Sequence, residues 1–133
     1  MPLTTQDINL WLCNEPNFMG VFPVNKLPAP ATTSAELRLV VNTDPDNLPG
    51  THWIAIWRKG GSGEAEVFDS FGTIPPADVQ LWCSRYCSKW TCNNKCVQNP
   101  LSSLCGIYCC LFLSCRSQFN SLDDCVEYLS KLV

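Results

Sequence analysis

The chain has 133 residues, the length of one domain; 46% are hydrophobic and 16% charged, which excludes a disordered segment. Its formal net charge is −3 and its basic residues are scattered, which argues against nucleic acid or an anionic membrane surface as a partner. No apolar stretch reaches membrane-spanning length and no signal-like segment opens the chain, so we expect a single domain over residues 1–133 of an intracellular, non-secreted protein.

The first half of the chain is predicted to contain one helix followed by three strands. Thr4 or Thr5 can cap a helix that ends near residues 13–14 and has apolar residues at helical spacing: Ile8, Trp11 and Leu12. Residues 16–30 form a connection rich in proline around the apolar piece 18–22. Runs of β-branched and aromatic residues predict three strands: 37–42, 52–58 and 64–69. The second is apolar on both faces and therefore central, and a glycine-rich loop joins it to the third as a hairpin.

The second half is predicted to be mainly helical. Two prolines open an amphipathic helix over residues 75–90, and a short strand is expected over 95–98. The most apolar segment predicts a central helix over 104–117. Ser121 is the expected N-cap of a last helix whose inward residues are Cys125, Val126, Leu129 and Leu132. This order of helices and hairpin strands indicates an α+β fold.

Ten cysteines need an explanation in such a chain. Without a secretory signal, most are expected to be buried thiols that pack as small hydrophobic residues. Four of them leave a structural zinc site or a disulfide between Cys92 and Cys96 open as alternatives: Cys83, Cys87, Cys92 and Cys96. Since Cys83 and Cys87 share the apolar stripe of one predicted helix, plain thiols are favoured and no metal ligands are assigned.

Four residues at separate points of the chain carry the chemistry of a cysteine peptidase. His52 is the only histidine, so any cysteine–histidine chemistry must use it. Cys105 lies at the start of the apolar helix, where unpaired backbone N–H groups favour a thiolate. Asp69 ends the strand that pairs with the His52 strand, so antiparallel pairing brings acid and base to one edge of the sheet. The amide of Gln98 and the backbone N–H of Cys105 can donate to an oxyanion, and Trp53 can shield the ion pair.

These residues resemble the adenovirus protease (adenain) family of cysteine peptidases, which is related in fold to the SUMO proteases. The matching stretches cover most of the chain in order: 16–22, 41–43, 50–53, 68–72 and 98–106, with Cys109 and Cys110. The last stretch is the most specific because it includes the spacing from the glutamine to the cysteine.

The resemblance implies a papain-like fold, with a central mixed or antiparallel sheet flanked by helices and the catalytic cysteine at the N-terminus of a central helix. It implies a triad of Cys105, His52 and Asp69, with Gln98 in the oxyanion hole. It also implies an endopeptidase that cleaves viral precursor proteins at glycine-containing sites during virion maturation, in the infected cell, its nucleus and the virion. The substrate-binding residues it indicates are Trp53, Gly50 and Asn42.

The chain departs from the family pattern in ways that affect its partners. The adenovirus enzymes usually have glutamate at the position of Asp69. The SUMO protease branch already tolerates aspartate there. The chain lacks their long C-terminal part, and its acidic charge argues against their activation by DNA. Activation by a disulfide-linked viral peptide is a family trait for which Cys87 is the candidate attachment point. The sequence itself requires no cofactor.

Two alternatives use the same residues differently. One is an isopeptidase that acts on the tails of ubiquitin or SUMO, which requires the same thiol chemistry. The other is a catalytically inert, cysteine-rich interaction module that could bind zinc. Each candidate residue also has a structural interpretation taken singly: Cys105 as a buried thiol, Asp69 as a turn former and Gln98 as a loop cap.

Overall fold

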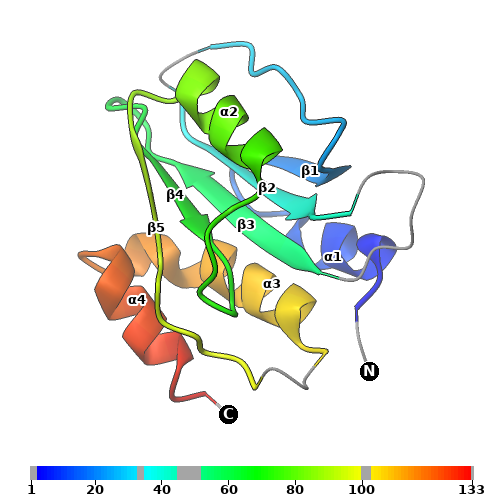
Figure 1. The fold of residues 1–133 in the computed structure, drawn as a ribbon, viewed down its shortest axis with the longest axis vertical. Coiled ribbons are helices and arrows are strands. Elements are labelled where there is room, and N and C mark those ends of the chain that lie inside the picture. Colours follow the sequence, from blue (N-terminus) through cyan, green and yellow to red (C-terminus); the bar gives the residue numbers. More distant parts are fainter. Residues whose placement is uncertain (1–2, 33–34, 45–51, 100–102, 133) are drawn as a thin grey trace.

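One mixed sheet organises the computed structural model, which describes residues 3–32, 35–44, 52–99 and 103–132 (Figure 1). Its five strands lie in sequence order and are β1 (Phe18–Pro23), β2 (Leu37–Asn42), β3 (Trp53–Arg58), β4 (Ala65–Phe68) and β5 (Trp90–Cys92). β3 pairs antiparallel with β2 and β4, whereas the edge strands β1 and β5 run parallel to their neighbours. The predicted α+β class with a central mixed sheet is therefore confirmed, and β3 is the middle strand as expected.

Helices cover both faces of the sheet, which explains why every residue of β3 is buried and why all but Arg58 are apolar (Figure 1). The helical elements are α1 (Thr5–Leu12), α2 (Ala77–Tyr86), α3 (Cys105–Cys115), the 3₁₀ turn η1 (Arg116–Gln118) and α4 (Leu122–Leu129). α2 packs on one face through Val79, Trp82 and Cys83. α1, α3 and α4 build the other core, and α3 is buried along most of its length. None of the helices in the described residues is long and apolar enough to cross a membrane.

Both predicted serine/threonine caps are present. The Thr4 hydroxyl accepts the Asp7 backbone N–H at 3.1 Å, and the Asp7 carboxylate accepts the Thr4 N–H at 2.9 Å, so the two residues form a capping box. The Ser121 hydroxyl accepts the Asp124 N–H at 3.1 Å. Leu132, expected to point inward, lies beyond the end of α4 and is 43% exposed, so that part of the prediction is wrong.

Three segments differ from the sequence-based expectation because pairing partners distant in the chain decide them. Residues 18–23 form the edge strand β1, and Gly20 at φ 127° allows the irregular register with β2. α2 ends at Tyr86 instead of near residue 90, because Trp90 pairs with Ala65 of β4. The predicted strand 95–98 is a loop.

The C-terminal end of α3 is held by two buried arginines. The Arg38 Nε donates to the Leu113 carbonyl oxygen at 3.1 Å, near the last turn of the helix. The Arg116 guanidinium binds both carboxylate oxygens of Glu66 in β4, at 2.5 and 2.8 Å, and stacks over Trp57. Positive charge at a helix C-terminus complements the helix dipole. These contacts fix α3 against the sheet and thereby set the position of its N-terminus.

Candidate active site

His52 and Asp69 meet at one edge of the sheet. His52 directly precedes β3 and Asp69 directly follows β4, and the antiparallel pairing of these strands brings the two side chains together. The His52 Nε2 lies 2.8 Å from the Asp69 Oδ1. Because an ionised carboxylate can only accept, Nε2 carries the proton, and Nδ1 is the nitrogen left for chemistry. The backbone of His52 is also fixed, because the Thr43 backbone N–H donates to the His52 carbonyl oxygen at 2.9 Å.

Asp69 is buried but remains a carboxylate because several donors surround it. Oδ1 also accepts the Phe71 backbone N–H at 2.8 Å, and Oδ2 accepts the Thr73 hydroxyl at 2.5 Å. Burial raises the pKa of the carboxyl group, but the hydrogen bonds from His52, Thr73 and Phe71 outweigh burial and lower it below its ordinary value. Asp69 therefore keeps its negative charge beside the imidazole.

Cys105 is the first residue of α3, as the sequence predicted for the thiol. Burial raises the pKa of its thiol, but the His52 side chain and the backbone N–H groups of Trp53 and Gly106 stabilise the thiolate and lower that pKa overall. Gly106 allows the N-terminal segment to pack closely on the start of α3, since a Cβ there would lie 3.3 Å from side-chain atoms of Leu3 and Ile8. The start of α3 is thus electrostatically suited to a thiolate.

The imidazole of His52 is the titratable partner of the Cys105 thiol. Burial lowers the pKa of His52, but its interactions with Asp69 and Cys105 raise it to about 9. Nδ1 is buried and has no hydrogen-bond partner within the part of the chain that the structure describes. With the thiol pKa lowered and the imidazole pKa raised, proton transfer from Cys105 to His52 is favoured.

Gln98 is connected to the His52–Asp69 pair through Ser70, the residue that follows Asp69. Gln98 is 3% exposed, and its Oε1 accepts the Ser70 hydroxyl. The backbone N–H groups of Val97 and Gln98 donate to the Ser70 carbonyl oxygen at 2.8 and 3.2 Å. These bonds explain why residues 95–98 form no strand: their donors are used by the turn after β4.

The turn after β4 supplies supporting residues that the sequence analysis missed. The Phe71 ring stacks on the His52 imidazole, with centroids 4.7 Å apart, and covers one face of it. Gly72 has φ +70°, and a Cβ there would lie 2.8 Å from the backbone of Lys95. The one available signal was the glycine directly after Asp69, Ser70 and Phe71, since glycine marks a tight turn.

The predicted substrate-binding residues have mixed outcomes. Trp53 is buried in the core of α1 and α3, and its indole N–H has no hydrogen-bond partner in the described residues. Asn42 pairs with Trp53 at the end of β2 and therefore lies at the same sheet edge as His52. Gly50 lies outside the described residues. Cys87 follows α2 and packs in the opposite core, so the structure does not bring it to the triad residues.

The other cysteines form no metal cluster. All ten are free thiols, and no group of three histidine, cysteine, aspartate or glutamate side chains gathers within the described ranges. Cys83, Cys109, Cys110 and Cys125 are buried, as expected of core thiols. Two pairs are in contact, Cys83 with Cys87, and Cys115 with Cys125, whose sulfurs are 3.9 Å apart.

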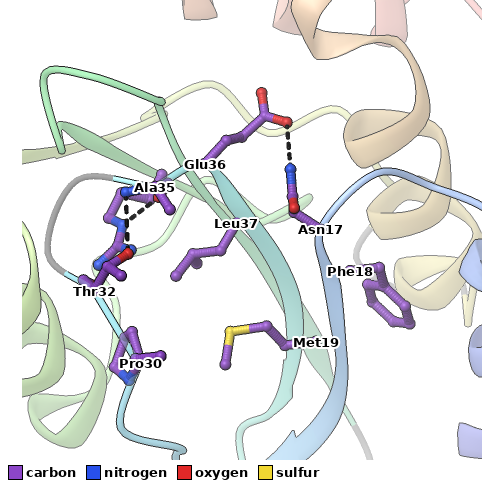
Figure 2. Close-up of a pocket in the computed structure, with 10 residues that line it drawn as sticks. Asn17, Phe18, Met19, Pro30, Thr32, Ala35, Glu36 and Leu37 are labelled. Atoms are coloured by element: carbon purple, nitrogen blue, oxygen red, sulfur yellow. Dashed lines mark hydrogen bonds between the residues drawn. The ribbon is translucent and has the colours of Figure 1, made fainter.

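A pocket of about 240 Å³ lies away from the triad residues (Figure 2). It is lined by residues of β1, of the start of β2 and of the segment before it, including Met19, Glu36 and Leu37. The register of the sheet pairs Leu37 with Arg58 and Asn42 with Trp53, so the pocket lies at the opposite end of β2 from His52. Its buried Arg58 donates to three backbone carbonyl oxygens, which indicates a structural role.

Comparison with known proteins finds similarity to viral proteases. The protease of bovine adenovirus C serotype 10 is 32% identical over 90 residues, which are 56% of this chain and 45% of that protein. The protease of porcine adenovirus A serotype 3 is 26% identical over 134 residues, covering 84% of this chain and 65% of that protein. The crystal structure of the African swine fever virus protease pS273R superposes with a TM-score of 0.70 at 19% identity, over 98% of this chain and 65% of that one. No protein-family model matches the chain.

The chain is therefore similar in sequence to the adenovirus proteases and shares the fold of the pS273R protease. Its matched segments span about half to two thirds of the length of these relatives.

Proposed function

We propose that the chain is a cysteine endopeptidase whose nucleophile, base and orienting acid are Cys105, His52 and Asp69. One observation carries the proposal: the His52 imidazole is held by Asp69 at 2.8 Å and interacts with the thiol at the N-terminus of α3. The pKa of the imidazole is raised to about 9 and that of the thiol is lowered, which are the directions that form a thiolate–imidazolium pair. The homology to viral proteases supports the same reaction class.

The chemistry follows from this pair. The Cys105 thiolate forms a bond to the carbonyl carbon of the scissile peptide, and the C=O π electrons move onto oxygen. The backbone N–H of Cys105 and the amide of Gln98 donate to that oxyanion. When the C=O bond re-forms, the C–N bond breaks and the His52 Nδ1 gives its proton to the leaving amine. Water, deprotonated by the same nitrogen, then hydrolyses the thioester and releases the acid product and the thiol.

The proposed substrates are viral precursor proteins cut at glycine-containing sites during particle maturation. Similarity to adenovirus proteases supports this choice. The proposed setting is the infected cell, including its nucleus, and the virion. The triad reaction requires no cofactor, and DNA activation is not proposed for a chain of net charge −3. A peptide linked to Cys87 would bind on the α2 side of the sheet.

Limited alkylation tests the thiolate directly. At mildly acidic pH, a small amount of iodoacetamide should modify Cys105 in the native protein, as read by mass mapping, because ordinary thiols are protonated there. The exposed thiols of Cys13 and Cys96 are the internal reference. The His52→Ala variant should lose the selectivity for Cys105. Labelling of Cys13 and Cys96 ahead of Cys105 in the wild-type protein would contradict the proposal.

Substrate turnover tests the reaction. Fluorogenic peptides with a glycine before the scissile bond are compared with peptides that carry a ubiquitin or SUMO tail. Faster cleavage of the viral-type peptides supports the endopeptidase, and faster cleavage of the tails supports the isopeptidase alternative. Hydrolysis that persists in the Cys105→Ala variant would show that Cys105 is not the nucleophile.

A further inference from the structure

We propose that Ser70 is a positioning residue that fixes the oxyanion donor Gln98, so that the dipeptide Asp69-Ser70 orients both the base and the oxyanion hole. This inference rests on the proposed peptidase function and deepens it. The observation behind it is a buried hydrogen bond between two side chains: the Ser70 hydroxyl donates to the Gln98 Oε1. Ser70 is fully buried and Gln98 is 3% exposed, so this bond is shielded from competing water.

The direction of the bond determines the role. An oxyanion donor must present N–H groups, and a glutamine amide carries its carbonyl oxygen and its NH₂ group on opposite sides of the same carbon. Because the Ser70 hydroxyl donates to Oε1, it anchors the amide in the orientation that directs NH₂ away from Ser70. A serine hydroxyl can also accept a hydrogen bond, so the positioning comes from this anchoring at a buried site and not from the hydroxyl's chemistry alone.

The backbone gives the same two residues a second connection. The Ser70 carbonyl oxygen accepts the N–H groups of Val97 and Gln98 at 2.8 and 3.2 Å. The distance between the turn after β4 and the loop before α3 is thus fixed by main-chain bonds that do not depend on any side chain. Loss of the Ser70 hydroxyl should leave this connection in place and affect mainly the amide of Gln98.

Asn93 binds the backbone of Asp69, the first residue of the Asp69-Ser70 dipeptide. Its Oδ1 accepts the Asp69 backbone N–H at 2.9 Å, and its Nδ2 donates to the Asp69 carbonyl oxygen at 2.7 Å. Asn93 is itself buried. Because both backbone groups of Asp69 are bound, Ser70 leaves the strand in a defined direction, toward Gln98 and away from solvent. One short segment therefore sets two catalytic groups, the carboxylate through Asp69 and the amide through Ser70.

The test separates thiolate chemistry from oxyanion stabilisation. Iodoacetamide reacts with the Cys105 thiolate without forming an oxyanion. A peptide aldehyde with a C-terminal glycinal forms one: sulfur bonds to the carbonyl carbon, the π electrons move onto oxygen, and that oxygen takes the imidazolium proton to give a thiohemiacetal. In the Ser70→Ala variant, we expect an unchanged alkylation rate and pH profile, with aldehyde affinity and peptide kcat reduced about tenfold or more and KM little changed.

A double-variant cycle shows whether Ser70 acts through Gln98. Ser70→Ala should have no further effect on kcat in a Gln98→Ala background, because the group that it positions is already gone. The Ser88→Ala variant is the control: it removes a serine hydroxyl that donates a hydrogen bond away from the site, to the Ser62 backbone carbonyl oxygen at 2.9 Å. Thermal unfolding of each variant confirms that comparisons are made between folded proteins.

The outcomes distinguish this inference from the proposed function. Normal aldehyde affinity in Ser70→Ala, or equal effects of Ser70→Ala in both backgrounds, overturns the positioning role while the peptidase stands. Slower alkylation in Ser70→Ala also overturns it, since the serine would then act on the thiolate pair. Absence of selective Cys105 alkylation in the wild-type protein overturns the peptidase and this inference with it.

Discussion

The two ends of α3 each meet a buried carboxylate from the same part of the sheet, yet the two contacts have different consequences. At the C-terminal end, Glu66 of β4 binds Arg116 through two hydrogen bonds. At the N-terminal end, Asp69, three residues further along, binds His52, which interacts with Cys105. Both carboxylates are at most 5% exposed and hydrogen-bonded.

The difference lies in the partner. A guanidinium does not take part in proton transfer in proteins, so the Glu66–Arg116 pair ties β4 to the end of α3 without offering acid–base chemistry. An imidazole can lose its proton, and the thiol beside it can supply one, so the Asp69–His52 pair can take part in a reaction. Burial and hydrogen bonding alone therefore do not mark a catalytic carboxylate. What marks it is a titratable partner that itself touches a nucleophile.

Removal of the nucleophile or base should have the largest effect. We expect Cys105→Ala to abolish turnover and His52→Ala to reduce kcat by about 10⁴-fold or more, because no other group can form or stabilise the thiolate. Unfolding in urea should change little for Cys105→Ala. Active-site titration and peptide hydrolysis measure the loss, with Cys13→Ala as an exposed-cysteine control. Substantial turnover by His52→Ala would remove the distinction drawn between the two ends of α3.

Replacement of the orienting acid should have the next largest effect. Asp69→Asn keeps the size of the side chain but removes the charge that stabilises the imidazolium. We expect a loss in kcat about a hundredfold smaller than that of His52→Ala, because orientation supports the reaction without forming bonds. The Asp78→Asn variant, on α2, is the control and should leave kcat unchanged. A loss as large as that of His52→Ala would mean that Asp69 does more than orient the base.

The opposite end of α3 should lose stability and keep its chemistry. Arg116→Met leaves Glu66 buried without its main partner, which costs about 3 kcal/mol, the lower end of the usual range, because Lys59 lies 3.6 Å from the carboxylate. The double variant Glu66→Leu/Arg116→Met should recover most of that free energy of unfolding. Urea denaturation measures both. A large drop in kcat for the folded Arg116→Met protein would show that the two ends are coupled.

The pH profile should separate the titratable pair from the fixed one. The pKa of Cys105 is lowered and that of His52 is raised to about 9, so kcat/KM should rise well below the pH at which ordinary thiols ionise. It should fall as pH passes about 9, because the imidazolium that protonates the leaving amine is lost. The contribution of the His52 interactions to the free energy of unfolding changes in the same direction. It is fully present below pH 6.5 and is lost as the pH rises through about 9. A falling limb near pH 6.5 would contradict this assignment.

The smallest effect is expected at Thr73. Thr73→Val removes the hydroxyl that donates to the Asp69 Oδ2 and leaves the bonds from His52 and Phe71. One hydrogen bond to a charged group is worth about 1.5 kcal/mol, so kcat/KM should fall about tenfold or less. The pKa of Asp69 should rise, and the loss of activity in acid should therefore begin at a higher pH. Thr91→Val, at the exposed middle residue of β5, is the matched control.

Local patterns in the sequence predicted most of the fold. The apolar run of β3, the glycine-rich hairpin and the caps at Thr4 and Ser121 are decided by residues close in the chain, so they could be identified without a structure. The strands β1 and β5 could not, because each exists through parallel pairing with a strand distant in sequence. The same long-range pairing explains why α2 ends at Tyr86.

By itself, the sequence determined which residue types the site would contain: a single histidine, a cysteine at a helix start and an aspartate after a paired strand, in adenain-like order. Only the tertiary structure decided how they are held. Phe71 on the imidazole, Thr73 on the carboxylate, Ser70 on Gln98 and Asn93 on Asp69 are contacts set by a turn packed against a distant loop. Their partners lie up to 28 residues away, and no local pattern of apolar residues encodes a hydrogen bond between two buried polar side chains at such a separation.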